Sequence, residues 1–252
     1  MVTLKATMTK ISAVLLLCSV VLTPSCRKAS TGPVGTRVDV QSDGWKLVGD
    51  LAIPKAREPV PAVLMLNKAA GNREVYSDLA DELAIRGIAS LRLDLRGHGE
   101  SVNLGTFVPT DEGRAMIAGT EADVIAACQY LRSLHGIDST SIAVVGASYS
   151  GEEMMQAARI AGYADAYVAL SPGSLSDESI RSIDSTGIPW FYIASKDERW
   201  LKEVTAAVLQ MSHSAETLIL PGTSHATDIL QSRPDIAARI AVWLAAHLKD
   251  RP

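Results

Sequence analysis

Short apolar runs alternate with amphipathic stretches along most of this chain, and that alternation predicts its elements. Strands are indicated where apolar and β-branched residues run almost uninterrupted, and helices where apolar residues recur every three or four positions. The predicted strands are Arg37–Val40, Trp45–Pro54, Pro61–Asn67, Ile88–Leu95, Ser141–Gly146, Ala166–Leu170, Pro189–Ser195 and Glu216–Gly222. The predicted helices are Tyr76–Arg86, Glu121–His135, Ser150–Ala161, Leu201–Met211 and Pro234–Lys249.

The order of these elements predicts an α/β fold. The first two strands are joined through Ser42-Asp43-Gly44, which is typical of a hairpin. From Pro61 onward strands and helices alternate, which predicts a mostly parallel sheet of about eight strands with helices on both faces. Ligands of such sheets bind beyond the carboxyl ends of the strands, so those ends are where chemistry is expected.

The N-terminal region differs from the rest of the chain. Two lysines, Lys5 and Lys10, precede an apolar run, Ile11–Leu22, which is too short to span a bilayer and is followed by small residues. This order predicts an export signal over residues 1–25, a linker over 26–36 and one domain over 37–252. A buried N-terminal helix is the alternative, but the run has no amphipathic pattern.

The segment Leu-Thr-Pro-Ser-Cys, ending at Cys26, resembles a bacterial lipobox. The resemblance implies a lipid anchor at Cys26 and a location in the cell envelope, at a membrane facing the periplasm or the outer surface. Thr23 departs from the leucine usual in such boxes. Cys128 would then have no disulfide partner, and its place in a helical pattern indicates a buried thiol.

Charge and histidine spacing exclude two classes of function. The formal net charge is −4, so binding to nucleic acid has no electrostatic support. His98 lies in a predicted turn and three further histidines lie at or within predicted helices, and their spacing offers no metal cluster. We therefore expect neither a metal nor an organic cofactor.

A candidate nucleophile lies directly after the strand Ser141–Gly146. The segment Gly146-Ala147-Ser148-Tyr149-Ser150-Gly151 nearly matches G-x-S-x-G between a strand and a helix, the context a nucleophile elbow requires. Taken alone, the segment is more typical of an ordinary strand-to-helix turn. In an elbow, Ser148 would be the nucleophile, and its neighbours two positions away must be small, as Gly146 and Ser150 are.

Acidic and basic partners follow two later strands. Asp197 and Glu198 come after Pro189–Ser195, and His225 comes after Glu216–Gly222. A serine nucleophile needs a nearby base, and that base needs a carboxylate to fix its tautomer. Because the carboxyl ends of parallel strands share one edge of the sheet, all three groups are expected there.

With these residues the chain resembles the α/β-hydrolase superfamily from Thr36 to Lys249. Leu91–Ser101, LRLDLRGHGES, is similar to the family's D-x-R-G-x-G-x-S segment, and the hairpin segment SDGWKLVGDLAIP resembles its dienelactone-hydrolase-like and prolyl-peptidase-like branches. The resemblance implies Ser148 as nucleophile, Asp197 as acid and His225 as base. Asp177, after the preceding strand, is the alternative acid.

The chain departs from the family after the third strand. Where His-Gly-x-x-Gly is common, it has Asn67-Lys68-Ala69-Ala70-Gly71. By position, the amides of Ala69 and Tyr149 are the expected oxyanion donors. Lys68 replaces the usual glycine, and either a solvated side chain or a contact with an acidic substrate is consistent with it.

These observations predict an exported serine hydrolase that cleaves small-molecule carboxylic esters through an acyl-enzyme. The same residues would serve a peptidase, thioesterase or lactonase, and the fold also supports non-catalytic binding proteins. Residues 188–200 leave no room for a lid domain, so only Val102–Thr120 is expected to form a rim, with Phe107, Met116 and Ile117 as possible substrate contacts.

Overall fold

The computed structural model describes residues 35–248. The predicted export signal, Cys26 and most of the predicted linker lie outside the described residues. Within that described range, no helix combines the length and the apolar character needed to cross a membrane.

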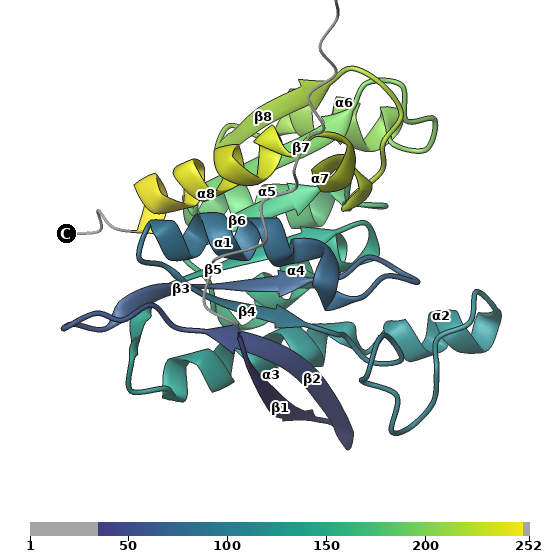
Figure 1. Cartoon of the computed structure of the whole chain (residues 1–252). Coiled ribbons are helices and arrows are strands. Elements are labelled where there is room, and N and C mark those ends of the chain that lie inside the picture. The colour runs from purple at the N-terminus through teal and green to yellow at the C-terminus, as the bar shows by residue number, and fades with distance from the viewer. Residues whose placement is uncertain (1–34, 249–252) are drawn as a thin grey trace, which may run out of the picture.

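The domain is built on one sheet of eight strands (Figure 1). The strands are β1 (Thr36–Ser42), β2 (Trp45–Ala52), β3 (Val60–Leu66), β4 (Ala89–Leu93), β5 (Ile137–Ala147), β6 (Ala166–Leu170), β7 (Trp190–Ser195) and β8 (Ala215–Leu220). Their spatial order is β1-β2-β4-β3-β5-β6-β7-β8. The pairs β1/β2 and β2/β4 are antiparallel and the remaining pairs are parallel, so the carboxyl ends of β3 to β8 share one edge.

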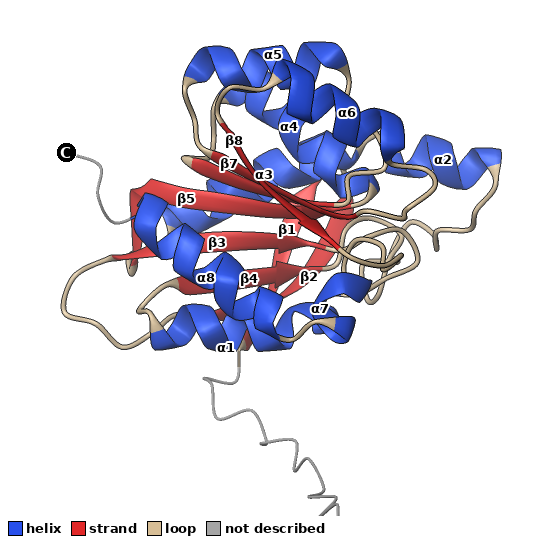
Figure 2. Ribbon diagram, turned by 90° about the horizontal axis from the view of Figure 1, so that it is seen from above, coloured by secondary structure: helices blue, strands red, loops and turns tan. Residues whose placement is uncertain are grey.

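Helices cover both faces of the sheet (Figure 2). They are η1 (Arg73–Tyr76), α1 (Ser77–Ile85), α2 (Asp111–Ile117), α3 (Thr120–Ser133), α4 (Tyr149–Ala161), α5 (Asp177–Thr186), α6 (Lys202–Met211), α7 (Asp228–Ser232) and α8 (Asp235–Leu248). Helices α1, α7 and α8 lie on one face and α3 to α6 on the other, while α2 projects beyond the sheet.

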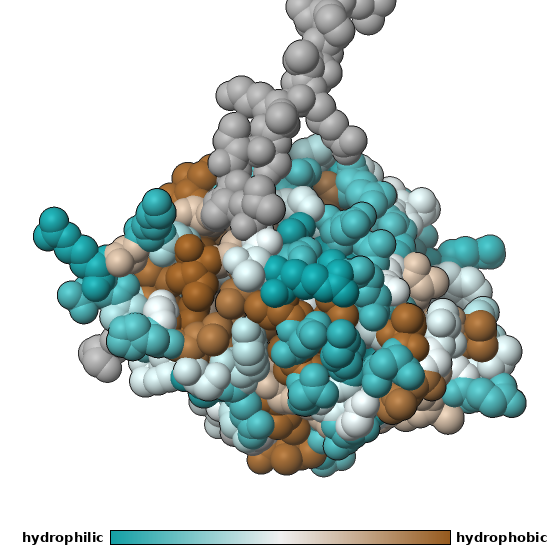
Figure 3. Space-filling model, turned by 60° about the horizontal axis from the view of Figure 1, so that its bottom comes forward, coloured by the Kyte–Doolittle hydropathy of each residue, from teal (hydrophilic) through white to brown (hydrophobic). Residues whose placement is uncertain are grey.

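Alternating side chains of the central strands supply two cores. In β3, Leu64 packs into the core under α3 to α6, whereas Val63 and Met65 pack into the core under α1 and α8. All three side chains are fully buried. The outer surface is mixed, and hydrophobic side chains reach the face shown in Figure 3 at several places between hydrophilic ones.

The predicted fold is confirmed, and most predicted elements fall within a few residues of the observed ones. Helix α5, which follows β6, was not predicted. Ser176 caps this helix by accepting a hydrogen bond from Ser179 N at 3.0 Å, and Gly187 ends it at φ +67°. The short helices α2 and α7 were not predicted either, because they have too few residues to show a period.

Candidate active site

Ser148 stands on a strained turn between β5 and α4. Its φ of +56° lies in the left-handed region, which is costly for a residue with a side chain and is expected of a nucleophile elbow. The turn also needs a glycine before it, because a Cβ at Gly146 would lie only 2.6 Å from the Ser150 carbonyl oxygen. The backbone of this turn therefore places Ser148 at the edge of the sheet where the parallel strands end.

Ser150, the departure from G-x-S-x-G, lies inside the turn. Its side chain is fully buried, its Oγ accepts a hydrogen bond from Ala147 N at 2.8 Å, and it lies 3.0 Å from Ala147 O. The hydroxyl thus bonds to the backbone of the turn instead of facing solvent. A serine is compatible with this position because the turn supplies both its donor and its acceptor.

His225 lies in the loop after β8 and connects the serine to an acid. Its Nε2 is 3.0 Å from Ser148 Oγ, and its Nδ1 is 2.6 Å from Glu198 Oε2. The two contacts use opposite nitrogens of one ring. With Nδ1 donating to the carboxylate, Nε2 is left as the acceptor for the serine proton.

Glu198 is held rigidly in the turn after β7. Its side chain is 2% exposed, and its Oε1 accepts hydrogen bonds from Ser171 Oγ at 2.7 Å and Ser195 N at 2.8 Å. Those bonds leave Oε2 for the imidazole. Ser195 Oγ also donates to Ser224 O at 2.7 Å, which ties the acid-bearing turn to the histidine loop.

The prediction that Asp197 holds His225 is wrong, because the adjacent Glu198 takes that place. The amide of Asp197 donates to Gly222 O at 3.0 Å in the loop after β8, and the Asp197 side chain is exposed. Asp197 and Glu198 point to opposite sides of this turn. The residue that points inward is Glu198, whose side chain is one methylene group longer. The alternative acid, Asp177, is also excluded by position, since it begins α5 and faces Arg181 at 3.5 Å.

A glycine without a side chain lies beside Ser148. Gly173 follows β6, and a methyl group added there would lie 3.5 Å from Ser148 Oγ and 3.8 Å from Tyr149 N. Tyr149 is the first residue of α4, so its amide has no acceptor within the helix and is a suitable oxyanion donor. Ala69 lies after β3, the parallel neighbour of β5, and its amide remains the predicted second donor.

The D-x-R-G-x-G-x-S segment shapes the adjoining loop. Arg96 makes a two-pronged ion pair with the fully buried Asp123 of α3, with its shortest distance at 2.6 Å. Ser101 Oγ donates to Asp94 O at 2.6 Å and accepts from Val48 N at 2.8 Å. The motif is therefore structural here: it fixes the loop that flanks the elbow.

Aromatic side chains from this loop and the rim pack beside the elbow. The His98 ring stacks between the rings of Phe107 and Tyr149. Its centroid lies 4.9 Å from that of Phe107 and 5.8 Å from that of Tyr149. Burial lowers the pKa of His98 and raises that of Tyr149, so both side chains are neutral at pH 7. Phe107, a possible substrate contact by its place in the sequence, packs against His98 beside the elbow.

The carboxyl group of Glu153, near the start of α4, has an altered pKa. Burial, reinforced by Glu121 and Glu152, raises the pKa of Glu153 to about 7.

Among residues 35–248, His, Cys, Asp and Glu side chains form no group of three that could hold a metal ion. Cys128 is buried in α3, as predicted, and burial raises the pKa of its thiol to about 12.

Known proteins share this architecture. Residues 43–226 match the model of the X-Pro dipeptidyl-peptidase (S15) family. An uncharacterized protein of Mycobacterium tuberculosis (strain H37Rv) is 32% identical over 121 residues, which are 48% of this chain and 40% of that protein. The chain thus spans less than half the length of the curated relative it matches.

Two solved structures have the same fold at low identity. Est1E from Butyrivibrio proteoclasticus, determined with bound ferulic acid, has a TM-score of 0.68 at 18% identity, over 83% of this chain and 99% of that one. A dienelactone hydrolase from Anabaena variabilis has a TM-score of 0.65 at 19% identity, over 85% and 98%. The chain belongs to the X-Pro dipeptidyl-peptidase (S15) family of hydrolases, on the α/β-hydrolase fold.

Proposed function

We propose that this protein is a serine hydrolase that cleaves small carboxylic esters through an acyl-enzyme. The observation that carries the proposal is the hydrogen-bonded series Ser148–His225–Glu198, with Ser148 on a strained elbow. Among residues 35–248 the only histidine that Glu198 contacts is His225, and Ser148 adopts a conformation that an ordinary turn does not require. These two features favour an enzyme over a binding protein on the same fold.

The geometry supports a two-step reaction. Ser148 Oγ attacks the acyl carbon while His225 Nε2 accepts its proton, and Glu198 stabilises the resulting imidazolium. The amides of Tyr149 and Ala69 would hold the carbonyl oxygen as it becomes negative. His225 then gives the proton to the leaving alcohol, and water activated by the same imidazole cleaves the acyl-enzyme to release the acid and restore Ser148.

The solved structures that share the fold favour an ester over an amide as the substrate. One of them is named a dienelactone hydrolase, and Est1E was determined with bound ferulic acid. The family match makes a peptide bond after proline the second candidate, because that is the substrate in the family's name. A panel of an ester, a thioester, a lactone and an X-Pro amide on the purified protein separates these reactions by kcat/KM.

The acyl-chain preference tests whether the space beside Ser148 receives the substrate. We expect Gly173→Ala to lower kcat/KM about a hundredfold, and more for longer acyl chains, because its methyl group would stand 3.5 Å from Ser148 Oγ, where the acyl group must approach, and a small misplacement of reacting atoms is costly. The measurement is a series of chromogenic esters from acetate to octanoate. Gly136→Ala is the matched control, since its added methyl group would meet only Ile53, at 3.5 Å.

If Gly173→Ala and Gly136→Ala had the same chain-length profile as the unaltered protein, the acyl group would bind elsewhere. If the X-Pro amide were cleaved with a higher kcat/KM than every ester, the protein would be a peptidase instead.

We also propose export and lipid anchoring at Cys26, supported by the order of Lys5/Lys10, Ile11–Leu22 and Cys26 along the chain. Cys26→Ser is expected to move the protein from the membrane fraction to the soluble fraction, because a lipidated N-terminus holds a protein at a bilayer. Immunoblots of fractionated cells measure this. Cys18→Ser, in the same region, is the control and should not change the distribution.

If the unaltered protein were soluble after export, lipid anchoring would be wrong.

A further inference from the structure

The lysine that replaces a glycine after β3 has a partner on a different loop. Lys68 Nζ lies 2.6 Å from both carboxylate oxygens of Asp228, which is 160 positions later in the chain. The side chains are 24% and 47% exposed, respectively, so the pair lies at the surface of the site and only partly in solvent. The carboxylate of Asp228 balances the positive charge of Lys68. Lys68 is therefore not free to bind an acidic substrate.

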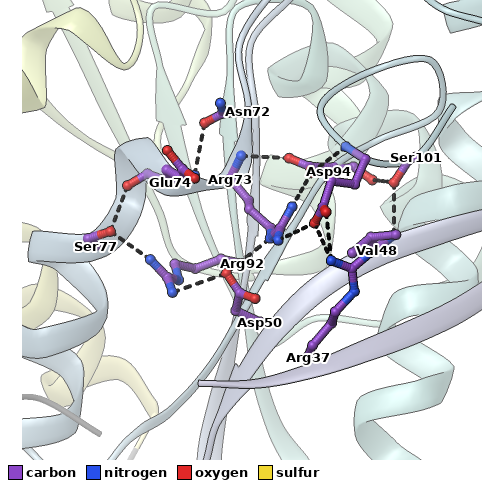
Figure 4. A network of polar contacts seen from close by, with 11 residues as sticks. Arg37, Val48, Asp50, Asn72, Arg73, Glu74, Ser77, Arg92, Asp94 and Ser101 are labelled. Carbon is purple, nitrogen blue, oxygen red and sulfur yellow. Dashed lines mark hydrogen bonds and ion pairs between the residues drawn. The ribbon is translucent and has the colours of Figure 1, made fainter. Parts of the chain in front are cut away.

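The base of the Lys68 loop is already fixed to the neighbouring strand and its following loop. Asn67 accepts a hydrogen bond from Leu95 N at 2.9 Å and donates to Lys68 O at 2.9 Å. At the far end, Arg73 N donates to Asp94 Oδ1 at 2.7 Å (Figure 4). Figure 4 also shows the Arg73 guanidinium directed at Asp50 and Asp94.

The middle of the loop is a tight turn around Ala69. Lys68 O accepts from Gly71 N at 3.0 Å, Asn67 Nδ2 lies 3.5 Å from Gly71 O, and Ala70 has a φ of +56°. The Lys68–Asp228 ion pair is the contact that reaches from this turn across the site.

Asp228 belongs to the same turn as His225, the proposed base. Its amide donates to His225 O at 3.0 Å, and the turn contains Ala226, which is fully buried at a φ of +53°. A carboxylate on this tight turn cannot move far without moving the histidine. The ion pair therefore joins the loop that carries the Ala69 amide to the turn that carries His225.

We propose that Lys68 and Asp228 are positioning residues: their ion pair holds the Ala69 loop and the His225 turn in the relative position that the reaction needs. This inference rests on the proposed hydrolase function. A partly exposed pair gives modest coupling, so we expect each loss to lower kcat about fivefold, equivalent to about 1 kcal/mol, with KM for an uncharged ester unchanged.

The test uses Lys68→Gln, Asp228→Asn, both together, and the exchange Lys68→Asp with Asp228→Lys. We would measure kcat and KM for an uncharged and an anionic ester, the rate of fluorophosphonate labelling, and the melting temperature. We expect kcat to be about fivefold lower in each single variant, and to be lowered by the same factor in the double variant. The exchange should restore most of the lost kcat. Lys46→Gln, which removes an exposed lysine 3.3 Å from Asp39 in the β1–β2 hairpin, is the matched control.

Equal kcat in all variants, with or without a lower melting temperature, would overturn the inference and leave the pair a structural contact. Losses that add in the double variant, or a KM change confined to the anionic ester, would overturn it in favour of independent roles or direct substrate binding by Lys68. Unaltered protein that neither hydrolyses esters nor labels would overturn the proposed function, whereas active protein insensitive to Lys68→Gln overturns the positioning role alone.

Discussion

Ser148→Ala is expected to lower kcat for ester hydrolysis by about 10⁶-fold, the loss typical of removing a serine nucleophile. No other hydroxyl among the described residues is recorded within hydrogen-bonding distance of His225 Nε2. The measurement is steady-state hydrolysis of a short chromogenic ester. Ser150→Ala is the control, because Ser150 Oγ bonds only to the backbone of the elbow and its neighbour strand.

A variant that lost Ser148 but kept a substantial part of its activity would show that another residue attacks the substrate. Activity lost equally in both variants would instead indicate that the elbow had collapsed, a result that circular dichroism and the melting temperature would reveal.

The second large effect concerns the acid. Glu198→Gln is expected to lower kcat about 10⁴-fold with little change in KM, as in a serine protease whose orienting carboxylate becomes an amide. The replacement keeps the shape of the side chain and its bonds to Ser171 and Ser195, but an amide does not stabilise the imidazolium of His225. Pre-steady-state acylation would measure the affected step.

Asp197→Asn is the matched control for this prediction. It makes the same chemical change one residue away, on a side chain that faces solvent. We expect Asp197→Asn to retain nearly full activity. If Asp197→Asn were the damaging change, the observed hydrogen bond between His225 and Glu198 would not be the one used in catalysis.

The sheet could be predicted from the sequence because its strands carry strong, local signals. The run Pro61–Asn67 is almost wholly apolar, as a strand buried on both faces must be, and β3 occupies Val60–Leu66. The elbow could be located for a similar reason: Gly146, Ser148 and Ser150 lie directly between a strand and a helix. Parallel strands then bring the loops of Ser148 and His225 to one edge.

The sequence predicts which turn carries the acid but not which residue of that turn it is. Asp197 and Glu198 are adjacent, and which one faces inward depends on the Asp197 amide pairing with Gly222 and on Ser171 donating to the glutamate. These contacts come from three different strand ends, so no local pattern reports them. Helix α5 is different, since its Ser176 cap and Gly187 end were visible in the sequence, but the mostly polar segment between them holds only two large apolar residues, Ile180 and Ile183, to indicate a buried face.

The role of Lys68 could not be predicted for a related reason. Its partner, Asp228, is set apart from it by most of the domain, and no spacing rule connects them. Although Asp228 lies close to His225 along the chain, its carboxylate turns toward Lys68.

The central claim is that Ser148 is the activated nucleophile, and identification of the residue modified by a fluorophosphonate tests it most directly. A fluorophosphonate reacts with a serine only where a base and an oxyanion site activate the hydroxyl. Purified protein would be labelled, digested, and the modified peptide sequenced by mass spectrometry. The account predicts one adduct per chain, on Ser148; an adduct on any other residue, or no adduct on folded protein, would contradict it.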